Sequence, residues 1–147
     1  MTDPTAVAAV RALARASRLM ERLSGDLNSA QYRVLSSIAS GDERASRIAA
    51  RLALGKPTIS ATVDSLVQRG LLTRSGADAD QRVAVLRLTD AGRDVLDRVE
   101  SDMIGRLTDL QARTPGGEQL LPSLIWLGRA IDELHAERQA ARRPVVR

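Results

Sequence analysis

The sequence predicts a mainly α-helical fold with a single β-hairpin. Apolar residues recur at steps of three and four in residues 44–53 and again in residues 56–70, which predicts two short helices joined by a tight turn. Residues 71–89 contain two apolar runs around a polar tip, and the second run has the two-residue period of a strand. Asp90 then begins another helix. This order of elements is typical of a winged helix-turn-helix.

Helices are also predicted on both sides of this unit. Residues 5–24 place apolar side chains at helical spacings, and Asn28 with Gln31 three positions later resembles a capping box at the start of the next helix. The helix that follows the hairpin is broken by Thr-Pro-Gly-Gly at 114–117, and the last helix begins near Glu118. The whole chain is therefore expected to be helical apart from the hairpin.

The composition fits one compact domain with an aliphatic core. The 147 residues are 44% apolar, with no Phe, one Trp and one Tyr. We expect a single domain over 1–147, with the winged helix-turn-helix in 28–92 and helical dimerisation segments in 1–27 and 93–147. The absence of Cys excludes disulfides and thiolate metal sites. No apolar run reaches about 18 residues and no signal segment is recognisable, so no membrane contact and a cytoplasmic location are expected.

The last helix carries the most regular apolar pattern of the sequence, which we call the C-terminal seam. Its residues are spaced 4, 3, 4 and 3, as in two heptads of a coiled coil, and they are Leu120, Leu124, Leu127, Ile131 and Leu134. Val7 and Val10 begin a similar apolar stripe in the first helix. We expect both sets to form the contact of a homodimer, since two subunits give a regulator more affinity for its site. Packing within one subunit is the alternative that the pattern leaves open.

Positive charge is concentrated in the helix-turn-helix and the hairpin. Eight basic residues lie between Arg44 and Arg87, against three acidic ones, although the net charge of the whole chain is only +4. A basic surface attracts phosphates and releases counterions from DNA, so binding should weaken as salt is added. The chain is therefore expected to bind double-stranded DNA.

These segments resemble the MarR family of transcriptional regulators over nearly the whole chain. The resemblance is carried by LNSAQYRVL at 27–35, by the helix pair at 44–70, and above all by Asp80-Gln81-Arg82 followed by Leu-Thr-Asp-Ala-Gly at 88–92. It implies a homodimeric regulator, most often a repressor, that binds a palindromic operator. It also implies a small aromatic or anionic ligand, bound between the dimerisation helices and the winged domain, that lowers DNA affinity. Met20, Tyr32 and Met103 are candidates for that crevice, although each could equally be an ordinary core residue.

The second helix of the pair, residues 56–70, is the expected recognition helix. Ile59, Val63, Leu66 and Val67 are expected to face the core, which leaves the polar and small residues on the free face. Gly55 stands where the family usually has a Ser or Thr cap. The complete set of expected DNA contacts is Arg47, Lys56, Pro57, Thr58, Ser60, Ala61, Thr62, Arg69, Arg74, Asp80, Gln81 and Arg82.

Within the expected wing, Asp80 and Arg82 are two residues apart, on one side of a strand, so they can pair. The carboxylate would then orient the guanidinium, and an oriented Arg suits the narrow, negative minor groove. A surface ion pair without a role in DNA binding is the alternative. The recognition helix has no Asn, Gln or Arg in the middle of its free face, so we expect weaker direct base readout and more reliance on the wing and on DNA shape.

An enzyme is not expected, and neither is a cofactor. The only His is His135, so no Ser-His-Asp triad and no site with two His ligands can be built. Asp78 and Asp80 lack a third carboxylate at the spacing of a calcium loop, and no glycine-rich phosphate loop is present. The main alternative to a DNA-binding regulator is a winged helix that binds another protein and has neither ligand response nor specific DNA binding.

Overall fold

The structure is a computed structural model that describes residues 3–23, 25–76 and 84–142. Mainly helical architecture with one hairpin is confirmed, and the elements follow one another as expected. They are α1 (Pro4–Leu23), α2 (Ser29–Ala39), α3 (Ala45–Leu52), α4 (Lys56–Gln68), β1 (Leu72–Ser75), β2 (Val85–Leu88), α5 (Asp90–Arg113), a short 3₁₀ turn (Gly117–Gln119) and α6 (Leu120–Arg142).

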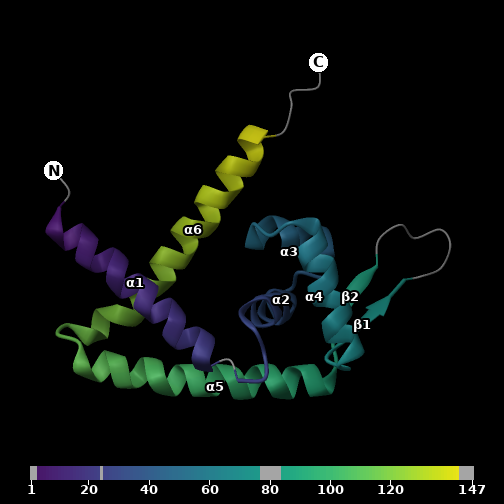
Figure 1. Ribbon diagram of the computed structural model, residues 1–147, viewed down its shortest axis with the longest axis horizontal. Coiled ribbons are helices and arrows are strands. Elements are labelled where there is room, and N and C mark those ends of the chain that lie inside the picture. Colours follow the sequence, from purple (N-terminus) through teal and green to yellow (C-terminus); the bar gives the residue numbers. More distant parts are fainter. Residues whose placement is uncertain (1–2, 24, 77–83, 143–147) are drawn as a thin grey trace.

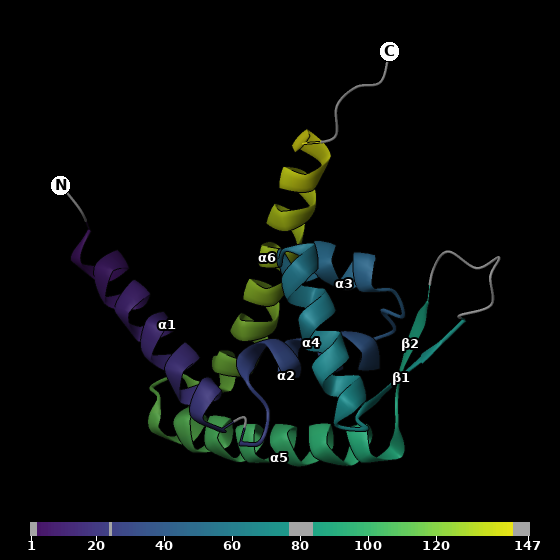
Figure 2. The ribbon, with the colours of Figure 1, turned by 45° about the vertical axis from the view of Figure 1, so that its right-hand side comes forward.

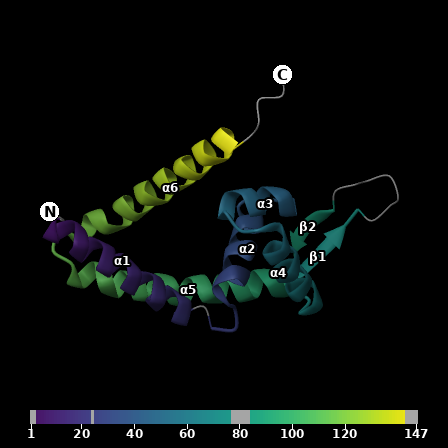
Figure 3. The ribbon, with the colours of Figure 1, turned by 45° about the horizontal axis from the view of Figure 1, so that its top comes forward.

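The long helix α5 is the base on which the other elements are arranged (Figure 1). The hairpin, α2, α3 and α4 gather at the end of α5 that follows the hairpin, whereas α1 packs against α5 nearer its other end. After the turn at the far end of α5, helix α6 runs back over the molecule and its last turns meet α3 (Figure 2). Helices α1 and α6 diverge from each other away from α5 in Figure 2, and in the third view they form a V that opens toward the end of the molecule that holds the hairpin (Figure 3).

The core lies between α2, α3, α4, the hairpin and the first half of α5. It is aliphatic, as the composition predicts, because every buried apolar residue is Leu, Ile or Val. Its most deeply buried large side chains are Leu35, Ile48, Ile59, Leu66, Leu72 and Leu86. Tyr32 and Met103 pack at the edge of this core rather than in its centre. The core thus lies within the winged helix-turn-helix, and helices α1 and α6 contribute little to it.

The helix ends are fixed by local hydrogen bonds. The predicted capping box is confirmed: the Asn28 side chain accepts from the Gln31 amide at 2.8 Å, and the Gln31 side chain accepts from the Asn28 amide at 3.0 Å. At the start of α5, the Thr89 hydroxyl accepts from the Gly92 amide at 3.0 Å and donates to the Gly70 carbonyl at 2.7 Å. The second contact joins the end of the recognition helix to the start of α5.

The hairpin is antiparallel, with Leu72 opposite Leu88 and Ser75 opposite Val85. Leu86 and Leu88 are buried while Arg87 between them is exposed, which confirms the two-residue period predicted for this strand. The Leu86 amide donates to the Glu43 carbonyl at 2.8 Å, so β2 is also tied to the segment that precedes α3.

One core prediction is wrong. Val67 was expected to face the core with the other apolar residues of α4, but it is 37% exposed. Ile59, Val63 and Leu66 are almost fully buried and make the contact between α4 and the core. Val67 lies about 100° further around the helix than Leu66, which turns it toward solvent.

Gly92 is required by the close approach of α5 to the strand that follows α4. A Cβ atom at this position would overlap the carbonyl oxygen of Leu71, which itself accepts a hydrogen bond from the Thr89 amide at 3.2 Å. Backbone on both sides leaves no room for adjustment. We expect Gly92→Ala to lower the free energy of unfolding by about 2 to 4 kcal/mol, measured by urea denaturation.

Gly105 is the matched control on the same helix, because a Cβ atom there would meet nothing within 4 Å. We expect Gly105→Ala to leave stability unchanged or to raise it by up to about 1 kcal/mol, from the higher helix propensity of Ala. Equal stability of the two variants would contradict the account of the junction.

Candidate nucleic-acid interface

Helix α4 presents one apolar and one open face. Ile59, Val63 and Leu66 are 0–1% exposed, whereas Thr58, Ser60, Ala61 and Asp64 on the opposite side are exposed. Thr62 is half-buried, and its hydroxyl donates to the carbonyl of Thr58 at 2.8 Å. Apart from Asp64, the open face is therefore made of small and hydroxyl-bearing side chains, which permit close approach of a duplex.

The start of α4 is open to an anion. Gly55 is its N-cap and no side chain caps the helix, while Lys56 and Pro57 form the first turn and are exposed. Pro57 fits here because its missing N–H would have no partner within the helix. The unpaired amides and the helix dipole favour a negative group at this end, and the Lys56 ammonium adds to the attraction.

A groove runs between α3, α4 and β1 beside this open face. It is lined by Lys56 and Ser60 of α4, by Arg74 of β1, and by small residues of α3 that include Ser46. The Arg74 guanidinium lies 2.9 Å from an Asp64 carboxylate oxygen, so the strand and the recognition helix are connected across the groove. Both partners are exposed, so this ion pair orients Arg74 more than it stabilises the fold.

The basic residues of this region fall into two groups. Arg44, Arg47 and Lys56 are exposed, and none of them forms an ion pair with another described residue. Arg51 pairs with Asp42 at 3.0 Å and Arg87 approaches Glu43 at 3.6 Å, so these two already have carboxylate partners.

The Asp42 carboxylate is also held by the fold. Partial burial favours its neutral form, but the hydrogen bonds from Ser37 and Arg51 outweigh this effect and hold the pKa of Asp42 below its ordinary value. Asp42 thus remains ionised and links Arg51, in the last turn of α3, to the segment that precedes this helix. The positive charge that has no carboxylate partner among the described residues of this region lies at Arg44 and Arg47, around the start of α3, and at Lys56 in the first turn of α4.

The structure does not bring Arg69 together with the other expected DNA contacts. Arg69 is the C-cap of α4, at the opposite end from Lys56, and its guanidinium donates to the Gln31 side chain at 3.1 Å. Gln31 in turn donates to Ser65 at 3.2 Å, so Arg69 belongs to a polar link between α2 and α4. Asp80, Gln81 and Arg82, together with Asp78, lie outside the described residues.

The three expected crevice residues do lie together. Met20 of α1, Tyr32 of α2 and Met103 of α5 line one cavity of about 190 Å³, with Ser17 and Arg33 at its edge. Burial, the neighbouring Glu100 carboxylate and a hydrogen bond to that carboxylate raise the pKa of Tyr32, so its hydroxyl stays protonated and is engaged with Glu100.

Arg33 was not anticipated as a crevice residue. Its guanidinium also donates to the Leu52 carbonyl at 3.2 Å, which links the crevice to the end of α3. Only its position next to Tyr32 in the sequence could have indicated that Arg33 reaches the crevice. This indication is weak, because adjacent residues of a helix usually point in different directions.

The outer helices leave their apolar residues uncovered. Leu124, Leu127, Ile131 and Leu134 of the C-terminal seam are 40–44% exposed, and Val10 of α1 is 68% exposed. Val7 and Leu120 are half-buried. The chain itself therefore does not bury the seam. Ile104 and Trp126, which belong to neither expected apolar stripe, are also 63% and 66% exposed.

The described residues give no indication of other chemistry. Within residues 3–23, 25–76 and 84–142, no group of three or more metal-binding side chains comes together. None of the helices in the same ranges is long and apolar enough to cross a membrane.

Comparisons with known proteins agree with this geometry. The sequence model of the MarR family matches residues 25–83. No curated protein sequence matches the chain. Among solved structures, the transcriptional repressor CouR bound to a 23-mer DNA duplex is 28% identical, with a TM-score of 0.70, over 84% of this chain and 89% of CouR.

Two further solved structures are similar. The transcriptional regulator PcaV from Streptomyces coelicolor, in complex with its natural ligand, is 28% identical, with a TM-score of 0.65, over 89% of this chain and 93% of PcaV. MarR of Staphylococcus aureus, in complex with salicylate and kanamycin, shares the fold at 23% identity and a TM-score of 0.68, over 82% of this chain and 83% of that protein. The chain thus matches the MarR family in sequence over residues 25–83, and it shares the winged-helix fold of transcriptional regulators such as CouR and PcaV.

Proposed function

We propose that the chain is a homodimeric, sequence-specific DNA-binding repressor that acts in the cytoplasm on a palindromic operator and is released by a small ligand. The observation that carries the proposal is the open face of α4. Its apolar side is buried, whereas Thr58, Ser60 and Ala61 remain exposed beside Lys56 and the paired Arg74. A helix so placed fits the major groove, with its first turn at a phosphate.

The proposed contacts on each half-site combine backbone and base contacts. Arg47, Lys56 and Arg74 would neutralise phosphates, while the hydroxyls of Thr58 and Ser60 reach phosphates or base edges. The methyl groups of Ala61 and Thr62 suit contact with a thymine methyl. Pro57 holds the first turn. We do not assign Arg69 to this surface, because its guanidinium is engaged with Gln31 at the other end of the helix.

The proposed dimer contact uses the apolar faces of α1 and α6. In the single chain these residues keep 40–68% of their surface exposed, as Leu124, Leu127 and Val10 illustrate. A second copy that covers them would bury apolar area worth roughly 25 cal/mol per Å². The resulting two-fold axis would place two copies of α4 on half-sites about one helical turn, some 34 Å, apart.

The proposed ligand site is the cavity between α1, α2 and α5. Met20 and Met103 give it apolar, adaptable walls, the Tyr32 ring suits an aromatic compound, and Arg33 suits an anionic one. Since Arg33 also contacts the Leu52 carbonyl at the end of α3, occupancy of the cavity can affect the helix pair. That PcaV was solved with its natural ligand supports a ligand for this chain as well.

The proposal is tested with the duplex that lies upstream of the chain's own coding sequence. A mobility-shift titration at moderate salt should give a discrete complex with that duplex and much weaker binding to a scrambled duplex of the same composition. Equal binding to both duplexes would show non-specific attraction only. No binding to either would favour the alternative, a winged helix that binds another protein.

A prediction for the wing follows from the sequence, since Arg82 lies outside the described residues. If Arg82 enters the minor groove, Arg82→Ala should weaken operator binding by about 1 to 3 kcal/mol without changing stability. Asp80→Ala should have a smaller effect, because it removes only the orientation of the guanidinium. Arg113→Ala, at the end of α5, has the same change of charge and is the control in the same anisotropy titration. Arg82→Ala with wild-type affinity would contradict the role of the wing.

A further inference from the structure

Helix α1 carries a row of arginines along one face. Their steps of four, three and four keep all the side chains on that face over about 16 Å of the helix. They are exposed, and none of them forms an ion pair with another described residue. We call this set the arginine row, and its members are Arg11, Arg15, Arg18 and Arg22. A surface groove of about 340 Å³ runs along its first three members, with Ala14 between them.

Helix α6 carries a row with the same spacing, which we call the α6 row. From the end of the helix toward its start, its members are Glu137, Glu133, Ala130 and Trp126, again at steps of four, three and four. All of them are exposed, and within the described part of the chain neither glutamate forms an ion pair. Trp126 is 66% exposed and Arg129 lies over one face of its ring at 5.4 Å, so the ring has a second face for another guanidinium.

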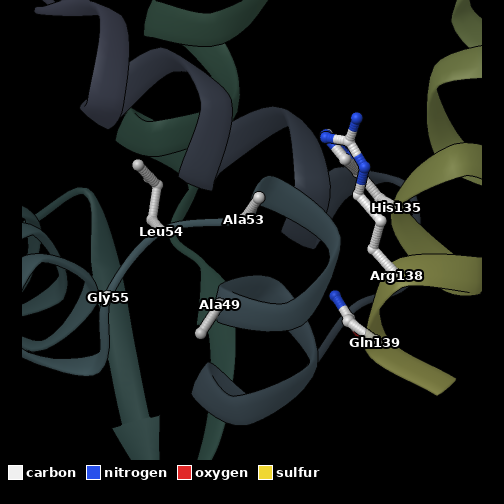
Figure 4. Close-up of a pocket in the computed structure, with 7 residues that line it drawn as sticks. All are labelled: Ala49, Ala53, Leu54, Gly55, His135, Arg138 and Gln139. Carbon is white, nitrogen blue, oxygen red and sulfur yellow. The ribbon is translucent and has the colours of Figure 1, made fainter. Parts of the chain in front are cut away.

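The chain itself occupies the opposite side of α6 near the end of this helix. The Gln139 amide donates a hydrogen bond to the Ala50 carbonyl of α3. Figure 4 shows His135, Arg138 and Gln139 extending to the side on which α3 lies, where they line a cavity whose other wall is the turn that joins α3 to α4. At about 100° per residue, the two glutamates of the α6 row lie on the other side of the helix. The α6 row is therefore open to a second molecule.

We propose that the arginine row binds the α6 row of a second copy of this chain, with the two helices antiparallel. Because both rows have the same spacing, antiparallel helices bring them together residue by residue. Arg11 then pairs with Glu137 of the partner subunit, and Arg15 pairs with Glu133 of the partner subunit. The helix dipoles of antiparallel neighbours also oppose each other, which favours this direction. Two-fold symmetry repeats the contact on the other side of the dimer.

The other positions of the two rows are also complementary. Arg22 lies opposite Trp126 of the partner subunit, where its guanidinium can stack on the ring. Arg18 lies opposite Ala130 of the partner subunit, whose small side chain lets the helices approach. Exposed ion pairs add little affinity, but like charges in contact exclude other partners, so the rows make the contact specific for this chain's own α6. The inference rests on the proposed homodimer, in which the C-terminal seam supplies the affinity.

The pairing is tested by exchanging charge between two variants. The first carries Arg11→Glu with Arg15→Glu, and the second carries Glu133→Arg with Glu137→Arg. Like charges face each other when either variant dimerises with itself, whereas opposite charges face each other in both contacts of a mixed dimer. In sedimentation equilibrium we expect each variant alone to dimerise at least about tenfold more weakly than the wild-type protein, and an equimolar mixture to form heterodimers with nearly wild-type affinity. The loss should shrink at about 1 M salt, which screens exposed charges.

Arg18→Glu with Arg22→Glu is the matched control, since it reverses two charges on the same row opposite residues that carry none. We expect it to weaken dimerisation less than the first variant does, and to form no heterodimer of improved affinity with the second variant. If this control instead exchanges with the second variant, the helices are parallel and the proposed pairing is wrong.

The remaining outcomes separate this pairing from the proposed function. A first variant that dimerises like the wild-type protein, or that gains nothing on mixing, would overturn the pairing and leave a dimer through the seam standing. If that variant dimerises normally but binds duplex DNA more weakly, the arginine row contacts phosphates instead. A monomeric wild-type protein would refute the proposed homodimer and this pairing together. Heterodimer formation by a chain that binds no operator would refute the DNA-binding function alone.

Discussion

Leu127→Asp is expected to separate the dimer into subunits and to reduce operator affinity at the same time. Leu127 lies in the middle of the C-terminal seam and is 41% exposed in the single chain, so its replacement leaves the core of the winged domain intact. In a two-fold contact the substitution places an unpaired carboxylate from each subunit in an apolar interface. An uncompensated buried charge is unfavourable by about 3 to 5 kcal/mol, so we expect monomers at micromolar concentration in sedimentation experiments.

Ala136→Asp is the matched control for this variant. Ala136 is an exposed residue of the same helix, and nine positions separate it from Leu127, which places it on the opposite face. The two variants have the same net charge. We expect Ala136→Asp to sediment as a dimer and to bind the operator with wild-type affinity. A dimeric Leu127→Asp that still binds DNA normally would show that the dimer contact lies elsewhere.

Operator affinity is expected to fall on the order of a thousandfold between low and moderate salt. The exposed basic residues on α3, α4 and β1 would occur twice in a dimer, so several phosphates would be neutralised on each duplex. Arg51, Arg74 and Arg87 should contribute less to the salt slope than Arg47 and Lys56, because each is paired with a carboxylate within the chain. Arg69 should also contribute less, because its guanidinium is engaged with Gln31. Anisotropy titrations over a series of salt concentrations measure the slope directly.

Lys56→Gln and Arg93→Gln distinguish a local effect from a general loss of charge. Lys56 is exposed in the first turn of α4, whereas Arg93 pairs with Asp90 in α5 at 3.3 Å. We expect Lys56→Gln to reduce the salt slope by about one per subunit, or about two for the dimer, and Arg93→Gln to leave it unchanged. A slope near zero for the wild-type protein would contradict phosphate neutralisation by this surface.

The order and type of the elements could be predicted from the sequence because their signals are local. Asn28 and Gln31 mark a helix start through contacts three residues apart, and Leu86 and Leu88 mark a strand by their alternation. The open face of α4 follows from the same reasoning, since burial of Ile59 and Val63 leaves Ser60 and Ala61 on the other side. The periods of the helix, 3.6 residues per turn, and of the strand, two residues, decide which side chains share a face without knowledge of the rest of the fold.

The remaining features depend on contacts between distant segments. In the sequence Arg69 looks like a DNA contact, because it is a basic residue at the end of the expected recognition helix. In the structure α2 packs beside the end of α4, and the Gln31 side chain accepts a hydrogen bond from the Arg69 guanidinium. The pairing of Arg74 with Asp64 requires the twist of the hairpin over α4. Neither interaction has a sequence pattern, because an exposed charge in a basic segment can turn toward any neighbour.

The cavity beside His135 shows the same limit over a longer distance. Its two walls, one in α6 and one at the turn that joins α3 to α4, are separated by at least 80 residues and meet only because α6 runs back from the end of α5 to α3. The seam, by contrast, was visible from its spacing. The spacing could not show whether other parts of the same chain cover the seam. In the structure Leu124, Leu127, Ile131 and Leu134 of the seam remain 40–44% exposed.

The central claim, that the open face of α4 binds the operator, is tested most directly by a charge placed on that face. Ala61 is exposed in the middle of α4, so Ala61→Glu puts a carboxylate against the duplex without disturbing the core. Ala112→Glu, on the exposed surface of α5, has the same net charge. Like charges in contact are unfavourable by several kcal/mol, so anisotropy titration should give an operator affinity for Ala61→Glu at least about a hundredfold weaker than for Ala112→Glu. Equal affinities of the two variants would show that α4 does not face the DNA.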